Sequence, residues 1–150
     1  EYRFSLGEID PVQVEWLEIS MELSSNAPMY RENFKSDIYV GLGETELGVW
    51  TSPGDYGARR GRFNPSWWSD TSSQYGLLKT WRVDNQGCTL DGEPLSSVTL
   101  ADLNLGGQDY LALRIGVHAD AAHVGGINLF GEQFGDFAQG IVVRVGYAKP

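Results

Sequence analysis

The chain has 150 residues, 41% of them hydrophobic, and this length and composition predict one folded domain rather than a disordered segment. Its formal net charge of −9 disfavours binding of nucleic acid or an anionic membrane by the chain itself, because phosphate groups would be repelled. Cys88 is its single cysteine, which excludes an internal disulfide and a thiolate metal cluster and fits a reducing compartment.

Alternation of apolar and polar residues predicts a series of β-strands. The alternation is clearest in residues 17–23, where Leu17, Ile19, Met21 and Leu23 share one face. One short helical turn is expected within residues 98–105, with Thr99 as its N-cap. The predicted strands in chain order are 2–6, 17–23, 38–42, 47–51, 77–83, 111–117, 127–131 and 141–147, the last with Ile141, Val143, Val145 and Tyr147 facing inward.

The predicted strands are separated by turn residues, and glycine accounts for 19 positions, against about 10 at average usage. Each of the about eight strands has one apolar face, which predicts an all-β fold, an antiparallel β-sandwich. A jelly-roll-like connectivity is favoured over an open Greek-key sandwich. Residues 1–150 form a single domain without a membrane-spanning segment.

Residues 51–76 form a connection long enough to suggest a functional loop. Arginines and aromatic residues are concentrated in it, and Trp67 and Trp68 are adjacent. Neighbouring side chains of an extended segment diverge, so one ring is expected in the core and the other in a groove. The alternative is that this loop only seals one end of the sandwich.

Aromatic faces stack on sugars or planar ligands, and arginine offers a fork for carboxylate or phosphate. A second loop, residues 118–128, contributes polar side chains of its own. Combining the two loops, the predicted ligand-binding residues are Asp55, Arg60, Trp67, Trp68, Tyr75, His123 and Asn128.

Signals for metal binding or catalysis are weak. His118, Asp120 and His123 have a spacing that suggests a metal site, but no fourth ligand follows, so neither a metal nor a cofactor is predicted. Nucleophile-elbow, zinc-helix and phosphate-loop motifs are missing. Glu22 with a neighbouring carboxylate is the one candidate for a glycosidase pair.

Three arginines, Arg82, Arg114 and Arg144, fall on the polar faces of predicted strands. We expect them to meet Glu18 and Glu22 on one sheet surface, as a solvated face with weak ion pairs. The alternative is a concave sheet surface on which the arginines bind an anionic ligand.

Several long motifs resemble a known family. They are residues 17–25 (LEISMELSS), 51–57 (TSPGDYG), 65–68 (PSWW), 74–81 (QYGLLKTW) and 123–131 (HVGGINLFG), followed by Phe134, Gly135 and Gln139. Together they resemble the C-terminal half of bacterial transcriptional regulators whose N-terminal domain is an ArsR-type winged helix. The resemblance extends from Glu1 to about Tyr147.

This resemblance implies an effector domain of a cytoplasmic transcription factor, which contacts DNA only through an N-terminal domain that lies outside this chain. The chain begins with Glu1 and is accordingly expected to be a piece of a longer protein. Two positions depart from the family: Gly43-Glu44 replaces an Asn-Gly turn, and Gly140 replaces a common aspartate. The thiolate pairs of metal-sensing repressors are also missing.

The leading hypothesis is a non-catalytic, ligand-sensing domain of a transcriptional regulator, which binds a small molecule such as a sugar, mediates homodimerisation, or both. A stand-alone carbohydrate-binding module is the first alternative, since it would use the same aromatic residues against a polymer. A jelly-roll enzyme resembling a glycosidase is the second alternative.

Overall fold

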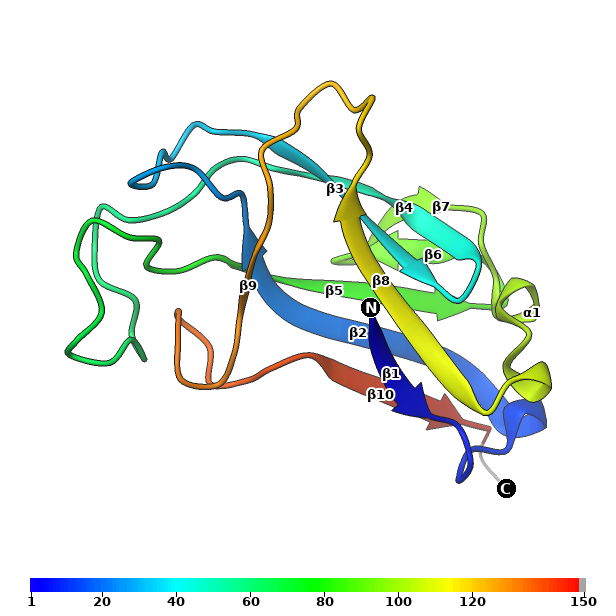
Figure 1. Ribbon diagram of the computed structural model, residues 1–150. Helices are drawn as coiled ribbons and strands as arrows, with labels where there is room; N and C mark the ends of the chain where they lie inside the picture. The colour runs from blue at the N-terminus through cyan, green and yellow to red at the C-terminus, as the bar shows by residue number, and fades with distance from the viewer. Residues whose placement is uncertain (149–150) are drawn as a thin grey trace.

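The computed structural model describes residues 1–148, which form two antiparallel sheets packed face to face (Figure 1). The first sheet has the order β1 (Tyr2–Ser5), β8 (Tyr110–Val117), β3 (Ser36–Leu42), β4 (Thr45–Ser52). The second sheet has the order β10 (Val142–Tyr147), β2 (Val14–Ser24), β5 (Leu77–Asp84), β6 (Cys88–Leu90), β7 (Glu93–Ser96), and β9 (Asn128–Phe130) pairs with the end of β2. The predicted all-β sandwich is confirmed.

The connectivity is jelly-roll-like. The chain crosses between the sheets on going from β1 to β2, β2 to β3, β4 to β5, β7 to β8 and β8 to β9. This repeated crossing is typical of a jelly roll. Residues 1–148 contain ten strands rather than about eight, because β6 and β7 form an extra hairpin. Each of these two strands is too short for its alternation to be recognised.

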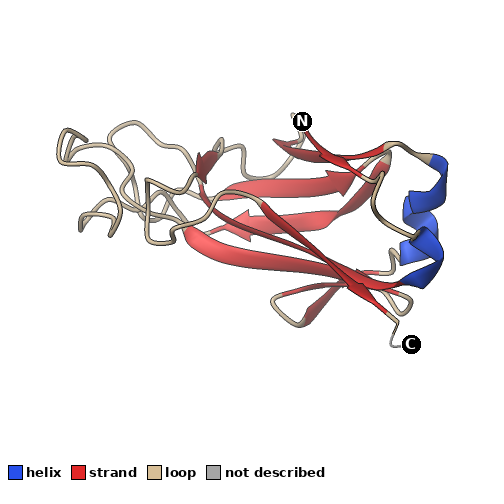
Figure 2. Ribbon diagram, turned by 90° about the horizontal axis from the view of Figure 1, so that it is seen from below, coloured by secondary structure: helices blue, strands red, loops and turns tan. Residues whose placement is uncertain are grey.

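Short helices and long loops occupy opposite ends of the sandwich (Figure 2). The helical end contains η1 (Pro11–Gln13), α1 (Leu100–Leu103) and η2 (Leu105–Gly107). The carboxylate of Asp102 accepts a hydrogen bond from the backbone N–H of Thr99 (2.9 Å), which confirms the predicted start of α1. None of the helices in residues 1–148 has the length and apolar character needed to cross a membrane.

The alternating apolar positions form the core between the sheets. Leu17, Ile19, Met21 and Leu23 of β2 are all buried, and they pack in one cluster with Trp81 of β5. Ile141, Val143 and Val145, in and just before β10, pack against the core as predicted. The prediction for Tyr147 is wrong, since this side chain is exposed. A register shift between Gly146 and Tyr147 turns the last residue of the strand away from the core.

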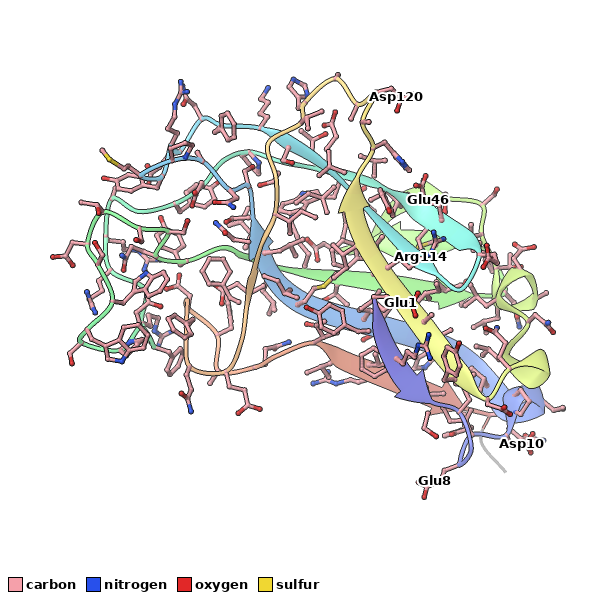
Figure 3. All side chains as sticks on the ribbon, in the orientation of Figure 1. Glu1, Glu8, Asp10, Glu46, Arg114 and Asp120 are labelled. Atoms are coloured by element: carbon pink, nitrogen blue, oxygen red, sulfur yellow. The ribbon has the colours of Figure 1, made fainter. Side chains whose placement is uncertain are left out.

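The predicted charged surface is only partly correct. Glu18 lies between Arg82 and Arg144 in neighbouring strands, and Arg82 donates to its carboxylate (2.9 Å). Arg114 instead belongs to the first sheet, over β8, where its Nε donates to a backbone carbonyl (Figure 3). Glu22 is fully buried, because a loop covers the end of β2. The ion pair between Arg82 and Glu18 is partly exposed, so it contributes at most about 1 kcal/mol to the free energy of unfolding.

The thiol of Cys88 is expected to be unreactive in the folded protein. Its side chain is buried, and burial raises the pKa of the thiol to about 11. At pH 8 only about one thiol in a thousand is then ionised, and the thiolate is the reactive species. Labelling with Ellman's reagent should be at least ~100-fold slower in native protein than in guanidinium-unfolded protein. Equal rates would show that β6 opens readily.

Candidate functional site

A pocket of about 490 Å³ lies among the loops at one end of the sandwich. The jelly-roll crossings place the loops that follow β2, β4 and β9 at this end (Figures 1 and 2). The pocket is lined from three stretches that are distant in the chain, within residues 26–30, 68–73 and 128–134. Its volume lies in the range of small-molecule sites.

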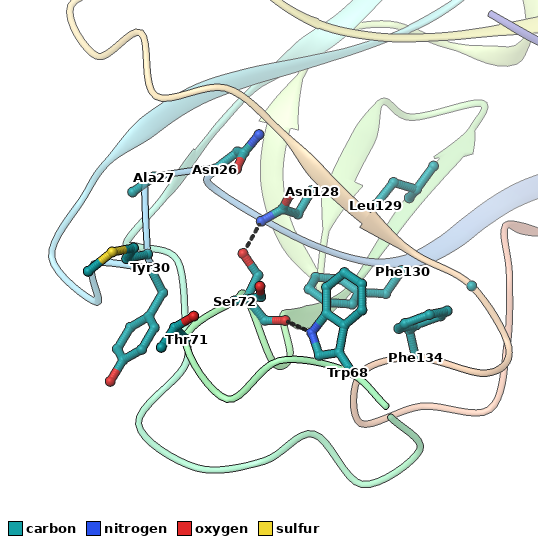
Figure 4. Close-up of a pocket in the computed structure, with 13 residues that line it drawn as sticks. Asn26, Ala27, Tyr30, Trp68, Thr71, Ser72, Asn128, Leu129, Phe130 and Phe134 are labelled. Atoms are coloured by element: carbon teal, nitrogen blue, oxygen red, sulfur yellow. Dashed lines mark hydrogen bonds between the residues drawn. The ribbon is translucent and has the colours of Figure 1, made fainter. Parts of the chain in front are cut away.

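Aromatic rings form one wall of the pocket. Trp68 and Phe134 meet edge to face, with their ring centroids 5.1 Å apart, and Phe130 lies beside them. The Nε1–H of Trp68 donates to the backbone carbonyl of Ser73 (2.8 Å), which fixes the orientation of the indole (Figure 4). Such a wall offers a ring face against which the apolar face of a ligand can pack.

Amide and hydroxyl groups also line the pocket, among them the side chain of Asn128 (Figure 4). Its Nδ2 donates to the carbonyl of Ser25 (2.9 Å) and to the hydroxyl of Ser73 (2.8 Å). Because a carbonyl can only accept, these bonds fix which side of the amide carries the nitrogen. Within residues 1–148, Oδ1 of Asn128 accepts no hydrogen bond, which leaves it able to accept one from a ligand. Asn26 and Ser72 add further polar groups.

None of the residues that line the pocket is charged. Two arginines of the long loop have other partners: Arg59 forms a two-point contact with Asp136 (3.0 and 2.6 Å), and Arg60 pairs with Asp70 (2.9 Å). Arg60 also donates to the carbonyls of Trp68 and Pro65. Arg59 and Arg60 therefore brace the loop, and the pocket itself suits a neutral ligand.

Buried Glu22 holds the loop that carries Phe134. Its carboxylate accepts backbone hydrogen bonds from Gly76 (2.8 Å), Asp136 (3.0 Å) and Phe137 (3.2 Å). Burial raises the pKa of Glu22 above its ordinary value, although these three donors oppose the shift. In contrast, the bond from Arg59 lowers the pKa of Asp136. Glu22, the one named candidate for a glycosidase pair, and Asp136 are thus both engaged within the protein, and neither lines the pocket.

Two of the seven predicted ligand-binding residues, Trp68 and Asn128, line the pocket. Trp67 lies at its rim, 73% exposed, with its ring edge-on to Phe134. The expectation that one of the adjacent tryptophans enters the core is wrong. Their loop extends beyond the ends of both sheets, and Trp81 fills the core instead.

Asp55, Tyr75 and Arg60 support the pocket from outside. Asp55 is fully buried, and its Oδ2 accepts from the backbone N–H of Ala27 (2.9 Å), so it fixes the 26–30 wall from behind. Tyr75 stacks on Tyr56 with centroids 5.2 Å apart. Arg60 braces the tryptophan loop, as described above.

His123 lies away from the pocket, beside the first sheet. Its backbone N–H donates to the carboxylate of Asp37 (2.9 Å). The pKa of Asp37 is lowered mainly by a hydrogen bond from the side chain of Thr51, and to a smaller extent by the hydrogen bonds from His123. His118 is similarly paired with Glu46 of β4. Among residues 1–148, no three His, Cys, Asp or Glu side chains converge as metal ligands.

Four residues that line the pocket are not among the seven predicted from the sequence: Asn26, Tyr30, Phe130 and Phe134. Asn26 begins a turn predicted over residues 26–28, and the two residues that follow it, Met29 and Tyr30, have left-handed backbones (φ 52° and 45°). Phe130 and Phe134 fall within the motifs that carry the family resemblance. Their position within these motifs was the signal by which the sequence could have identified them as site residues.

No protein-family model, curated protein or solved structure matches this chain. The family resemblance of its motifs therefore has no support beyond the residues themselves. The function has to be inferred from the geometry and chemistry of the pocket.

Proposed function

We propose that this chain is a ligand-sensing domain that binds a neutral, hydroxyl-rich small molecule, such as a sugar, in the pocket among the loops. The observation that carries this proposal is the pairing of an aromatic wall at Trp68 and Phe134 with the free amide oxygen of Asn128, in a lining without charge. Aromatic rings pack on the apolar face of a sugar, and amides exchange hydrogen bonds with its hydroxyls.

A regulatory role accords with this pocket. A ligand held there contacts three loops at once, and Glu22 ties the last of them to β2. The three loops are also hydrogen-bonded to one another, through Ala27 with Asp55, Asn128 with Ser73, and Arg59 with Asp136. A change that binding makes in one loop can therefore reach the others and bias a neighbouring domain or a dimer contact. The domain is accordingly proposed as the effector half of a cytoplasmic winged-helix regulator, with DNA contacted by another domain.

A thermal-shift screen with matched neutral and charged compounds tests the proposal. Suitable sets are glucose, glucose 6-phosphate and glucuronate, with the corresponding galactose and N-acetylglucosamine compounds. A ligand at 100 times its Kd adds about 2.7 kcal/mol of stability, which raises Tm by about 5–10 °C. We expect shifts from neutral sugars and none from their anionic counterparts. Preferential binding of the anions would contradict the proposal, and ultracentrifugation of the complex would show whether ligand changes self-association.

Trp68→Ala should weaken binding of a sugar found in that screen by about 2 kcal/mol, or about 30-fold, because the ligand loses its stacking surface. Trp68→Phe should retain most of the affinity. Trp16→Ala, on the outer surface of β2 far from the pocket, is the matched control and should leave affinity unchanged. Isothermal titration calorimetry measures all three. Unchanged affinity for Trp68→Ala would place the ligand elsewhere.

A further inference from the structure

A second hollow, of about 460 Å³, adjoins the pocket. It lies where β1 of the first sheet faces β9 and Ile141 of the second, on the side of the sandwich opposite to β4 and β7 (Figure 1). Leu129, Phe130 and Gly131 border both hollows. The two spaces therefore meet along β9.

Gly131 leaves the junction between the hollows open. A Cβ atom added at this position would meet nothing within 4 Å, and its backbone is not in the left-handed region. Gly140, at the far side of the second hollow, is equally unobstructed. A Cβ at position 131 would therefore enter open space at the border of the two hollows without a clash.

The second hollow offers its own aromatic surface. Tyr2 is 47% exposed, and by the alternation of β1 it shares a face with Phe4, which packs against the core. The one charged residue in the lining, Arg3, donates to the carboxylate of Glu1 (2.9 Å). Each hollow thus combines an aromatic ring with surroundings that carry no unpaired charge.

We propose that the two hollows form one groove that binds an oligosaccharide of at least two sugar units. One unit packs against Trp68 and Phe134, and the next crosses Gly131 and packs against Tyr2. This inference rests on the proposed function, since it extends the same site to a longer ligand. An extended peptide fits less well, because it would pair with a strand edge, and the two strands beside the groove, β1 and β9, have only four and three residues.

The test compares sugars of increasing length by isothermal titration calorimetry: glucose with cellobiose and maltose, and N-acetylglucosamine with chitobiose, each with its trisaccharide. We expect a disaccharide of the preferred series to bind about tenfold more tightly than its monosaccharide. Gly140→Leu and Tyr2→Ala, at residues that line only the second hollow, should each abolish that gain and leave monosaccharide affinity within about twofold. Ala101→Leu, on α1 at the opposite end of the sandwich, is the control.

The outcomes separate this inference from the proposed function. If monosaccharides bind and longer sugars bind no better, or if Tyr2→Ala weakens the binding of both equally, the groove is a single-unit site and the inference is wrong. If no sugar of any length binds, the proposed function itself fails. Saturable binding of extended peptides in place of sugars would overturn both. Melting temperatures of the variants confirm that each one folds.

Discussion

Replacing Glu22 by alanine is expected to lower the free energy of unfolding by about 3–5 kcal/mol. The carboxylate is fully buried and accepts hydrogen bonds from the backbone N–H groups of Gly76, Asp136 and Phe137. Alanine leaves these donors without their partner, and each unpaired buried donor costs about 1–3 kcal/mol. The loop that carries Phe134 should loosen, and ligand binding should weaken with it.

Glu18→Ala is the matched control for this experiment. Glu18 lies on the same strand, but its partner Arg82 is partly exposed, so its loss should cost about 1 kcal/mol or less. Urea denaturation of both variants measures the difference. A cost for Glu22→Ala as small as that for Glu18→Ala would mean that the loop finds other partners.

The stabilisation by Glu22 should also depend on pH. Burial raises the pKa of this carboxyl above its ordinary value of 4.5, so the native protein holds the proton more tightly than the unfolded chain does. Its contribution to stability is therefore greatest below the ordinary pKa and declines as the pH rises through the raised one. The free energy by which wild type is more stable than Glu22→Gln should therefore decrease as the pH rises from 4. A difference that grows with pH would show that the three donors outweigh burial.

Trp81→Ala should cost about 3–5 kcal/mol of stability through the cavity that it leaves. The ring is the largest fully buried side chain and lies at the centre of the core cluster. Its Nε1–H is buried without a hydrogen-bond partner among residues 1–148. Trp81→Phe removes this unpaired donor together with part of the ring, so it should cost clearly less than alanine.

Trp67→Ala provides the contrast, because that ring is largely exposed and should contribute less than about 0.5 kcal/mol. Chemical denaturation monitored by circular dichroism measures these variants without depending on tryptophan fluorescence. Comparable losses from Trp67→Ala and Trp81→Ala would contradict the assignment of Trp81 as the core tryptophan.

The amino-acid sequence by itself determined the fold class, because strand alternation is a local property. In β2 the side chains at positions 17, 19, 21 and 23 must share a face whatever the rest of the chain does, and the structure buries all four. The same rule failed at Tyr147, where pairing with β2 shifts register by one residue. A register shift depends on the partner strand and leaves no local pattern.

Only the tertiary structure decided the site. The pocket contains Asn26, Trp68 and Asn128 because crossings between the two sheets bring three distant loops to one end of the sandwich. The periodicity of a strand does not indicate which distant loops lie next to each other. Glu22 occupies a polar position of its strand, as Glu18 does, yet a later loop covers it and makes it the anchor of that loop. Burial of a polar side chain is decided by what packs over it, and a strand's own sequence does not encode that covering segment.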